Sequence, residues 1–141
     1  MTTMSAECTA LASPSAVAEA RQATRTFLGA LGPWGIDRDC ADTVILVVSE
    51  LVTNALRHGG GAYALGLAVH SDTIEVAVED SSPHAPRMRT PDLVDGTGGF
   101  GWHMVNDLAR ATIVTPTPGG GKAVRALLPR RTGGKREPAV G

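Results

Sequence analysis

The residues best suited to chemistry gather in one segment of the 141-residue chain. Glu50, Asn54 and Arg57 recur at intervals of three or four residues, and His58 follows directly. At about 100° per residue, the first three share a narrow sector of a helix that borders its apolar stripe, with His58 at the edge. Such a helix presents a carboxylate, an amide and basic groups at the rim of the core. The alternative is an ordinary solvated face, with Arg57 and His58 complementing the negative helix end.

A second candidate, Asp80, closes an alternating apolar stretch. It has the same parity as Ile74, Val76 and Val78, so its carboxylate is expected on the buried face of a strand. A carboxylate that loses its hydration is costly unless a donor meets it. We therefore expect Asp80 to accept an N–H group from a ligand. The alternative is that the strand has already ended and Asp80 lies in a turn, since Ser-Ser-Pro follows at 81–83.

Glycine-rich runs occur at two places. The run Gly-Thr-Gly-Gly-Phe-Gly at 96–101 fits G-x-G-x-x-G, but no apolar strand precedes it and no suitably placed acidic residue follows, which disfavours a dinucleotide fold. It lies at a helix start, where N–H groups and the dipole favour phosphate; the alternative is a lid hinge. The run before Lys122 is no phosphate loop, because Pro116 and Ala123 occupy required positions. It predicts a hairpin turn.

Composition narrows the function classes. With 13 Lys and Arg against 14 Asp and Glu, the net charge of -1 argues against a general nucleic-acid binder. The longest apolar run spans five residues, 44–48, and no leader-like segment opens the chain, so we expect no membrane partner. Two cysteines are too few for a disulfide scaffold and favour a cytoplasmic setting. The histidines lack metal-ligand spacing, and no nucleophile motif appears.

The elements that must position these residues follow from periodicity and from helix and turn signals. Ser13 and Pro14 predict a helix start, Gly32 and Pro33 its end, and Asp37 or Asp39 can cap the next helix. In chain order, the predicted elements are a helix to about 31, a helix to about 58, strands at 63–69 and 74–79, a helix at 100–109, and strands at 111–115 and 123–128.

One domain accounts for most of the chain. We expect it to span 13–129, after a loose N-terminus at 1–12 in which Glu7 to Leu11 can form a short edge strand. The stretch 81–98 lacks periodicity, as functional loops often do, and 130–141 reads as a disordered basic tail. Strands that come in hairpins imply an antiparallel or mixed sheet with helices on one face, an α/β sandwich.

Four segments in order carry a family resemblance. They read Glu-Leu-Val-Thr-Asn-Ala-Leu-Arg-His at 50–58, Val-Glu-Asp-Ser-Ser-Pro at 78–83, Gly-Gly-Phe-Gly-Trp-His-Met-Val at 98–105 and Gly-Gly-Gly-Lys-Ala-Val at 119–124. Together they resemble the histidine-kinase-like ATPase superfamily over about residues 10–129. Within it, the chain is most similar to the small stand-alone anti-sigma-factor serine kinases and ATP-binding regulators common in actinobacteria.

This resemblance implies a Bergerat-type fold, a two-layer α/β sandwich with a mixed, mostly antiparallel sheet. ATP would lie between helices and sheet, under a mobile lid at 81–98. Asn54 would ligate Mg²⁺ through its side-chain oxygen, and Glu50 would be the general base. Asp80 would accept the adenine amino group. The resemblance implies this ATP-binding set: Asn54, Arg57, His58, Asp80, Gly98, Gly99, Phe100, Gly101, Trp102 and Lys122.

Two departures from the family pattern concern the adenine pocket. The usual Asp-x-Gly-x-Gly is Asp-Ser-Ser-Pro at 80–83, and Lys122-Ala123 stands where Thr often follows the last glycines. The small-regulator branch shares them in part. The sequence shows no dimerising helical hairpin with a phospho-accepting histidine, so we do not expect a complete histidine kinase.

Three functions stay open at this point. The first is a Mg·ATP-dependent serine/threonine kinase that phosphorylates an anti-anti-sigma partner and also sequesters a sigma factor. The second is a non-catalytic module whose ATP-ordered lid controls a protein partner. The third is a small nucleic-acid- or metabolite-binding sandwich whose glycines only shape loops. Relatives often form homodimers, although the sequence carries no interface signature of its own.

Overall fold

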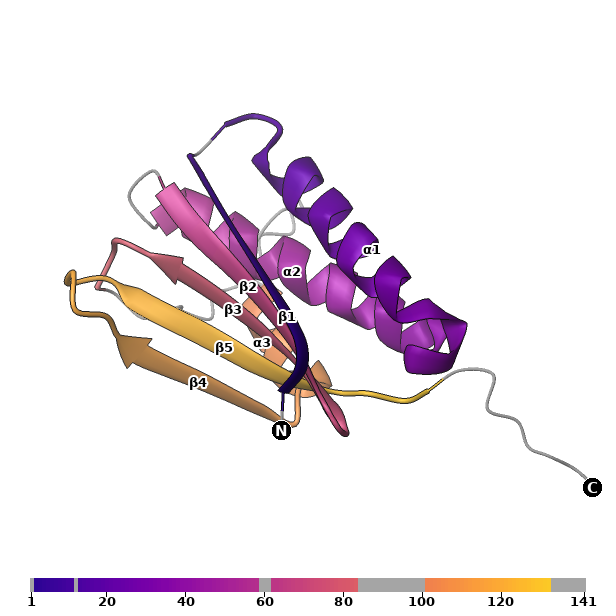
Figure 1. The fold of residues 1–141 in the computed structure, drawn as a ribbon. Helices are drawn as coiled ribbons and strands as arrows, with labels where there is room; N and C mark the ends of the chain where they lie inside the picture. Colours follow the sequence, from indigo (N-terminus) through magenta and orange to yellow (C-terminus); the bar gives the residue numbers. More distant parts are fainter. Residues whose placement is uncertain (1, 12, 59–61, 84–100, 133–141) are drawn as a thin grey trace, which may run out of the picture.

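The computed structural model describes residues 2–11, 13–58, 62–83 and 101–132. These residues form two layers, a sheet and a set of helices that covers one of its faces (Figure 1). The elements are β1 (Thr2–Leu11), α1 (Ala16–Gly35), α2 (Arg38–His58), β2 (Ala62–His70), β3 (Thr73–Asp80), α3 (Gly101–Leu108), β4 (Ala111–Pro116) and β5 (Lys122–Pro129). The predicted α/β sandwich is confirmed.

The sheet has the order β1-β2-β3-β5-β4, and every described pair of neighbouring strands is antiparallel. Both predicted hairpins are present, and no parallel pair makes the described sheet mixed. The edge strand β1 begins at Thr2 instead of Glu7, so residues 2–6 belong to the sheet and are not loose. Its side chains do not alternate clearly in polarity, which is why the sequence pattern underestimated its length.

Helix α1 ends, and helix α2 begins, close to the residues that the sequence predicted for these boundaries. Gly32 adopts φ 72°, a left-handed conformation that glycine tolerates, and α1 continues past this kink to Gly35. At the start of α2, the Cys40 N–H donates to Asp37 Oδ1 at 2.8 Å, so Asp37 is the capping residue. This hydrogen bond lowers the pKa of the Asp37 carboxyl. Burial raises the pKa of the Cys40 thiol.

The core lies between the helices and the covered face of the sheet. The predicted apolar stripe of α2 is buried in full, and α1 and α3 add their inward residues. From the sheet come alternate residues of β2 and β3, as the burial patterns show. The largest fully buried side chains include Leu65, Ile74, Leu128, Val44, Val47 and Val48.

The segment that follows β5 forms hydrogen bonds to other elements at the end of the molecule opposite the predicted site. Arg130 Nε donates to Gly35 O at 2.7 Å, and its Nη1 donates to His70 O at 2.9 Å. Arg130 therefore belongs to the folded domain and not to a disordered tail. The rest of the predicted tail, from 133 onward, lies outside the described residues. None of the described helices has the length and apolar character to cross a membrane.

Candidate functional site

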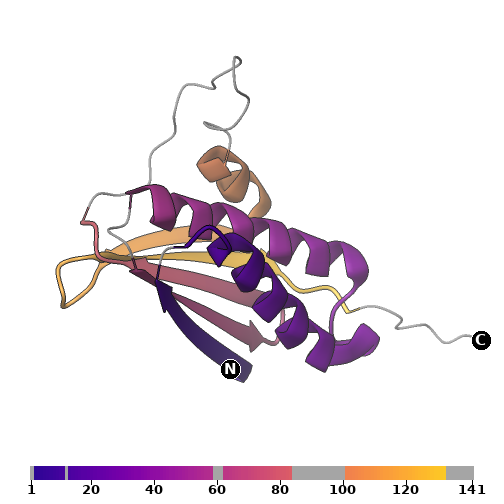
Figure 2. The same cartoon turned by 90° about the horizontal axis from the view of Figure 1, so that it is seen from above.

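Several predicted site residues meet at one end of the two-layer structure. Figure 2 shows the C-terminal end of α2, the end of β3 and the β4–β5 turn on the same side of the molecule. The strand register explains part of this arrangement, because Asp80 pairs with Tyr63 on one side and with Lys122 on the other. The antiparallel sheet thus brings the start of β2, the end of β3 and the start of β5 together.

Helix α2 contributes the polar sector expected from its sequence. The side chains of Glu50 and Asn54 are half-buried, and Arg57 is exposed near the end of the helix. His58 is the last residue of α2, and its side chain lies outside the described part. The side chains of this sector thus change from half-buried to exposed along the helix, which agrees with a sector at the border of the apolar stripe.

Glu50 lies against the start of α3. Gly101 is the first residue of that helix, and a Cβ atom built there would collide with the Glu50 carboxylate oxygen. Glycine at 101 therefore leaves room for a carboxylate where the helix exposes its first N–H groups. The sequence did not predict this contact, because Glu50 and Gly101 are far apart along the chain. Neither the helical repeat nor the alternation of a strand indicates which distant residues will lie in contact.

The rest of the glycine run is only partly described. Gly98, Gly99 and Phe100 lie outside the described residues, as does most of the expected lid, from 84 onward. Trp102 is half-buried and packs against the core, and Val105 on the same helix is fully buried. The predicted short helix is therefore confirmed at 101–108.

Asp80 is the last residue of β3 and its side chain is buried, with 3% exposed. The carboxylate does not depend on a ligand for a donor, because its own chain supplies donors. Lys122 Nζ donates to both carboxylate oxygens, at 2.9 Å each, and the Ser82 N–H donates to Oδ1 at 2.9 Å. The structure thus supplies the buried carboxylate with donors from its own chain. Lys122, expected among the ATP-binding residues, is itself 7% exposed and directly opposite Asp80.

The β4–β5 turn holds this arrangement in place. The Thr117 N–H donates to Gly121 O at 3.1 Å, and the Gly121 N–H donates to Thr117 Oγ1 at 3.1 Å. Gly120 adopts φ 91°. A Cβ atom at Gly121 would collide with the backbone oxygen of Asp80. The glycine run is a hairpin turn, as predicted, and it also allows β5 to begin close to the Asp80 backbone.

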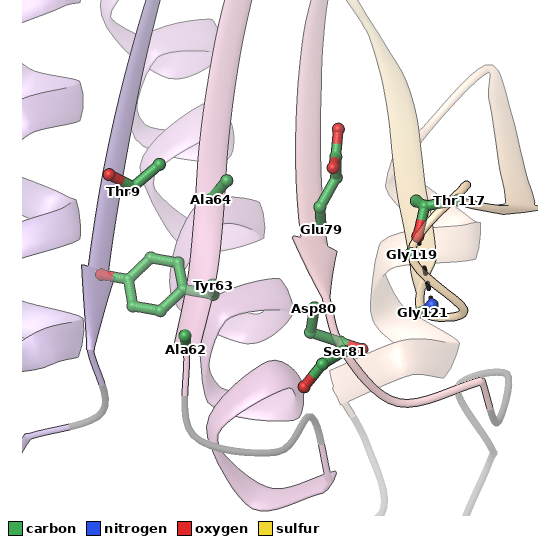
Figure 3. Close-up of a pocket in the computed structure, with 10 residues that line it drawn as sticks. All are labelled: Thr9, Ala62, Tyr63, Ala64, Glu79, Asp80, Ser81, Thr117, Gly119 and Gly121. Carbon is green, nitrogen blue, oxygen red and sulfur yellow. Dashed lines mark hydrogen bonds between the residues drawn. The ribbon is translucent and has the colours of Figure 1, made fainter.

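A cavity of about 610 Å³ opens at these strand ends (Figure 3). Figure 3 shows Asp80 and Glu79, successive residues of β3, turned in different directions. The volume of this cavity is within the range of small-molecule sites. Its lining comes largely from the uncovered face of the sheet, to which Ala64 and Glu79 belong, whereas the Asp80 side chain lies on the covered face. The lining residues are Thr9, Ala62, Tyr63, Ala64, Glu79, Asp80, Ser81, Thr117, Gly119 and Gly121.

The side chains that could ligate a metal ion fit one that the protein alone binds weakly. Within the described ranges, no three His, Cys, Asp or Glu side chains gather in a metal-binding group. Asn54 offers one amide oxygen from a half-buried position on α2. Mg²⁺ keeps several waters and takes few protein ligands when it accompanies a phosphate substrate. One amide oxygen at this position fits a Mg²⁺ ion that takes few protein ligands.

Comparison with known families agrees with this site. The sequence profile of a family described as "Histidine kinase-like ATPase domain" matches residues 10–127. The match runs from the end of β1 into β5 and covers each element that positions the site. A search of curated proteins found no match. The family expected from the four segments is confirmed, and ATP is the ligand that the family suggests.

Proposed function

Because the chain belongs to the histidine kinase-like ATPase family, we propose that it binds Mg·ATP and phosphorylates a serine or threonine of a small anti-anti-sigma protein. In this proposal it also sequesters a sigma factor, works in the cytoplasm and forms a homodimer. The observation that carries the proposal is the position of Glu50. Its carboxylate lies at the start of α3, and Asn54 follows one turn later on α2.

Each site residue has a role in this proposal. Asn54 contributes an oxygen ligand to Mg²⁺, which neutralises phosphate charge when it is bound. Arg57 and His58 approach the phosphates from the end of α2. Asp80 recognises the purine base, together with Lys122. The phosphate-binding backbone is the segment that leads into α3, with Gly98, Gly99, Phe100, Gly101 and Trp102.

The chemical step needs one base. The hydroxyl oxygen of the partner's serine attacks the γ-phosphorus of ATP, the bond from that phosphorus to the β–γ bridging oxygen breaks, and ADP leaves. Glu50 takes the hydroxyl proton. A carboxylate against a helix start is well placed for this role, because positioning and charge stabilisation supply most of the catalysis in phosphoryl transfer.

Nucleotide binding is tested first, by tryptophan fluorescence. In a Trp34→Phe protein, Trp102 is the remaining tryptophan and follows Gly101 directly. We expect its emission to change on titration with Mg·ATP. Asp80→Asn should weaken binding by about 10- to 150-fold, because a charged acceptor for the base is lost. A folded protein that gives neither heat nor a spectral change with millimolar Mg·ATP would contradict the proposal.

Phosphotransfer is tested with labelled ATP and candidate anti-anti-sigma proteins. Glu50→Gln should retain ATP binding and lose at least about 100-fold in transfer rate, the usual contribution of a general base. Glu7→Gln is the matched control, since Glu7 is an exposed glutamate of β1 that does not line the cavity. If Glu50→Gln transfers phosphate as fast as this control, the catalytic assignment is wrong.

A non-catalytic role is the second candidate, and the backbone after Asp80 favours it. Ser82 stands where the family usually has glycine, its N–H is bonded to Asp80, and Pro83 follows. In this role ATP orders the lid and the lid controls a protein partner without phosphotransfer. Partner affinity should then differ between free protein, ADP and a non-hydrolysable ATP analogue. Equal affinities in all three states would exclude this role.

A further inference from the structure

The outer edge of β4 presents backbone hydrogen-bonding groups that no described strand pairs with (Figure 1). β4 comes last in the sheet order β1-β2-β3-β5-β4, and β5 is its neighbour on the inner side. We propose that a second copy of this chain pairs its own β4 with this edge, antiparallel, so that two sheets join into one. The inference rests on the proposed function in one respect, the homodimer, and names the surface through which it forms.

The register of the hairpin shows which backbone groups point outward. The Thr117 N–H donates to Gly121 O at 3.1 Å, in the same register as the ladder between β4 and β5. Because hydrogen-bonded pairs alternate along an antiparallel ladder, every second residue counted back from Thr117 points its backbone groups toward β5. The residues between them point these groups away from the sheet, and they are Thr112, Val114 and Pro116. Proline lacks an N–H and is found in sheets mainly at edges, which agrees with this orientation.

Exposed apolar side chains flank this edge on both faces of the sheet. Ile113 is 43% exposed and Val114 is 38% exposed. Ile113 lies opposite Arg125 on the uncovered face, whereas Val114 lies opposite the buried Val124 on the covered face. Among the described residues, Leu46 on α2 is the remaining large apolar side chain with comparable exposure. A strand added at this edge therefore removes apolar surface from water on both faces.

The opposite edge of the sheet is protected in ways that β4 is not. Natural edge strands are usually guarded by charged side chains, bulges or proline. β1 carries Glu7 and has an irregular register between Thr2 and Met4. β4 reads Ala-Thr-Ile-Val-Thr-Pro, with no charge and with its proline at the last position. A regular, uncharged edge of this kind favours the addition of another strand.

The chemistry of the edge favours a second copy as the added strand. That strand has to be extended, uncharged and apolar on both sides, and β4 itself has each of these properties. In an antiparallel pair of two β4 strands, the outward N–H groups of Thr112 and Val114 meet outward carbonyl oxygens of the other copy. Arg110, directly before β4, is already paired with Asp72 at 3.3 Å, so no unpaired like charges are opposed. Such a pair uses the same surface twice and closes at two subunits.

Analytical ultracentrifugation of the full chain tests the proposal. We expect wild type to dimerise with a dissociation constant on the order of 10–100 µM, because the contact is small. Ile113→Lys and Val114→Lys should each weaken the dimer by about tenfold or more, because pairing then buries a lysine close to its own copy. The two side chains lie on opposite faces, so only an interface at the edge is sensitive to both. Leu46→Lys on α2 and Ala68→Lys on the uncovered face are the controls, and both should dimerise like wild type.

Hydrogen exchange gives a second readout that needs no variant. The amide hydrogens of Thr112 and Val114 should exchange about tenfold more slowly at a protein concentration well above the dissociation constant than well below it. The amide hydrogens of Ile113 and Thr115 point toward β5 and should change little with concentration. This alternation along one strand distinguishes strand pairing from a contact between side chains.

Each outcome decides one question. If wild type stays monomeric at about 1 mM, the inference is wrong, and so is the homodimer of the proposed function, while the nucleotide and phosphotransfer assays are unaffected. If a dimer forms that neither lysine variant at the edge weakens, the inference is wrong and the homodimer stands. Weakening by Ile113→Lys and Ala68→Lys but not by Val114→Lys would place the interface on the uncovered face and overturn the inference. Circular dichroism checks that each variant folds, and where one does not, hydrogen exchange of wild type decides.

Discussion

Two ion pairs join β3 to β5, and the two lie in different surroundings. Asp80 and Lys122 meet on the covered side at the strand ends, with 3% and 7% of their side chains exposed. Glu75 and Arg125 meet at 3.1 Å with 25% and 38% exposed. Arg125 is the direct partner of Ala77, so its contact with Glu75 runs diagonally across the two strands.

The comparison separates what an ion pair costs from what it contributes. Removing two charges from water is expensive, and a buried pair does little more than recover that cost. An exposed pair contributes at most about 1 kcal/mol. An apolar pair would therefore serve stability at least as well as Asp80 and Lys122. The buried pair therefore brings no gain in stability over an apolar pair, and Glu75 and Arg125 form an ordinary surface contact.

The largest effect should come from breaking the buried pair on one side only. Lys122→Met leaves the Asp80 carboxylate buried without its ammonium, which should lower the free energy of unfolding by about 3–5 kcal/mol. Arg125→Met should lower it by at most about 1 kcal/mol. Urea unfolding at pH 7 measures both values.

A double variant checks the physical cause. Asp80→Asn combined with Lys122→Met removes both charges, so the double variant should be more stable than Lys122→Met alone. Equal losses for Lys122→Met and Arg125→Met would show that the two environments do not differ as described.

The second effect compares the two faces within β3. Val76 is fully buried, and Val76→Ala should lower the free energy of unfolding by about 2–3 kcal/mol through lost burial and a cavity. Glu79 is exposed three residues later, and Glu79→Ala should change stability by no more than about 0.5 kcal/mol. Thermal unfolding followed by circular dichroism distinguishes them. A costly Glu79→Ala would mean that the uncovered face is packed against something else.

The third effect concerns the turn that positions the buried pair. Gly121→Ala places a Cβ atom against the Asp80 backbone, which cannot rotate away, so we expect a loss of about 1–3 kcal/mol. Gly119→Ala is the matched control from the same turn, because nothing lies within 4 Å of its Cβ position. Chemical denaturation of both variants tests the difference. A neutral Gly121→Ala would show that β5 does not need this close approach.

Local periodicity was sufficient to predict most of the fold. The helical repeat from Val44 to Ala55 predicted the buried stripe of α2, and alternation predicted both hairpins and the burial of Asp80. The extent of β1 was not predictable in this way, because pairing with β2 and not its own pattern defines it. The kink at Gly32 shows the same limit, since a glycine stop signal does not say whether helix resumes beyond it.

The sequence singled out candidate site residues one by one, but it could not predict the contacts between them. Parity placed Asp80 on the buried face, yet its partner Lys122 depends on the register between β3 and β5, which local sequence does not encode. The resemblance assigned Lys122 to nucleotide binding without this contact. Likewise, Glu50 and Gly101 were each singled out, and only the packing of α3 against α2 brings them together.

A fourth prediction uses the contact between Glu50 and Gly101 as the contrast to Gly121. Gly101→Ala also creates a collision, but its partner is the end of a flexible side chain that can move. We expect a stability change below about 1 kcal/mol. If Glu50 is the base, the same variant should slow phosphotransfer by about tenfold or more, because a small displacement of a catalytic group is costly. Calorimetric unfolding and a transfer assay, run on one preparation, separate the two effects.

The smallest effect belongs to Asp37, an aspartate far from the site whose donor is a backbone N–H. Its lowered pKa means that the folded state favours the carboxylate, so its contribution is complete above the unfolded-state value, about 3.8, and is lost as the pH falls through the folded-state value. Asp37→Ala should therefore lower the melting temperature at pH 7, and the gap to wild type should narrow below about pH 4. Asp37→Asn retains a capping oxygen without this titration and serves as the control. A gap for Asp37→Ala that stays constant down to pH 2 would mean that the hydrogen bond to Cys40 does not favour the ionised carboxylate. Nucleotide binding should be unchanged in both variants, since this cap lies at the opposite end of α2 from Asn54.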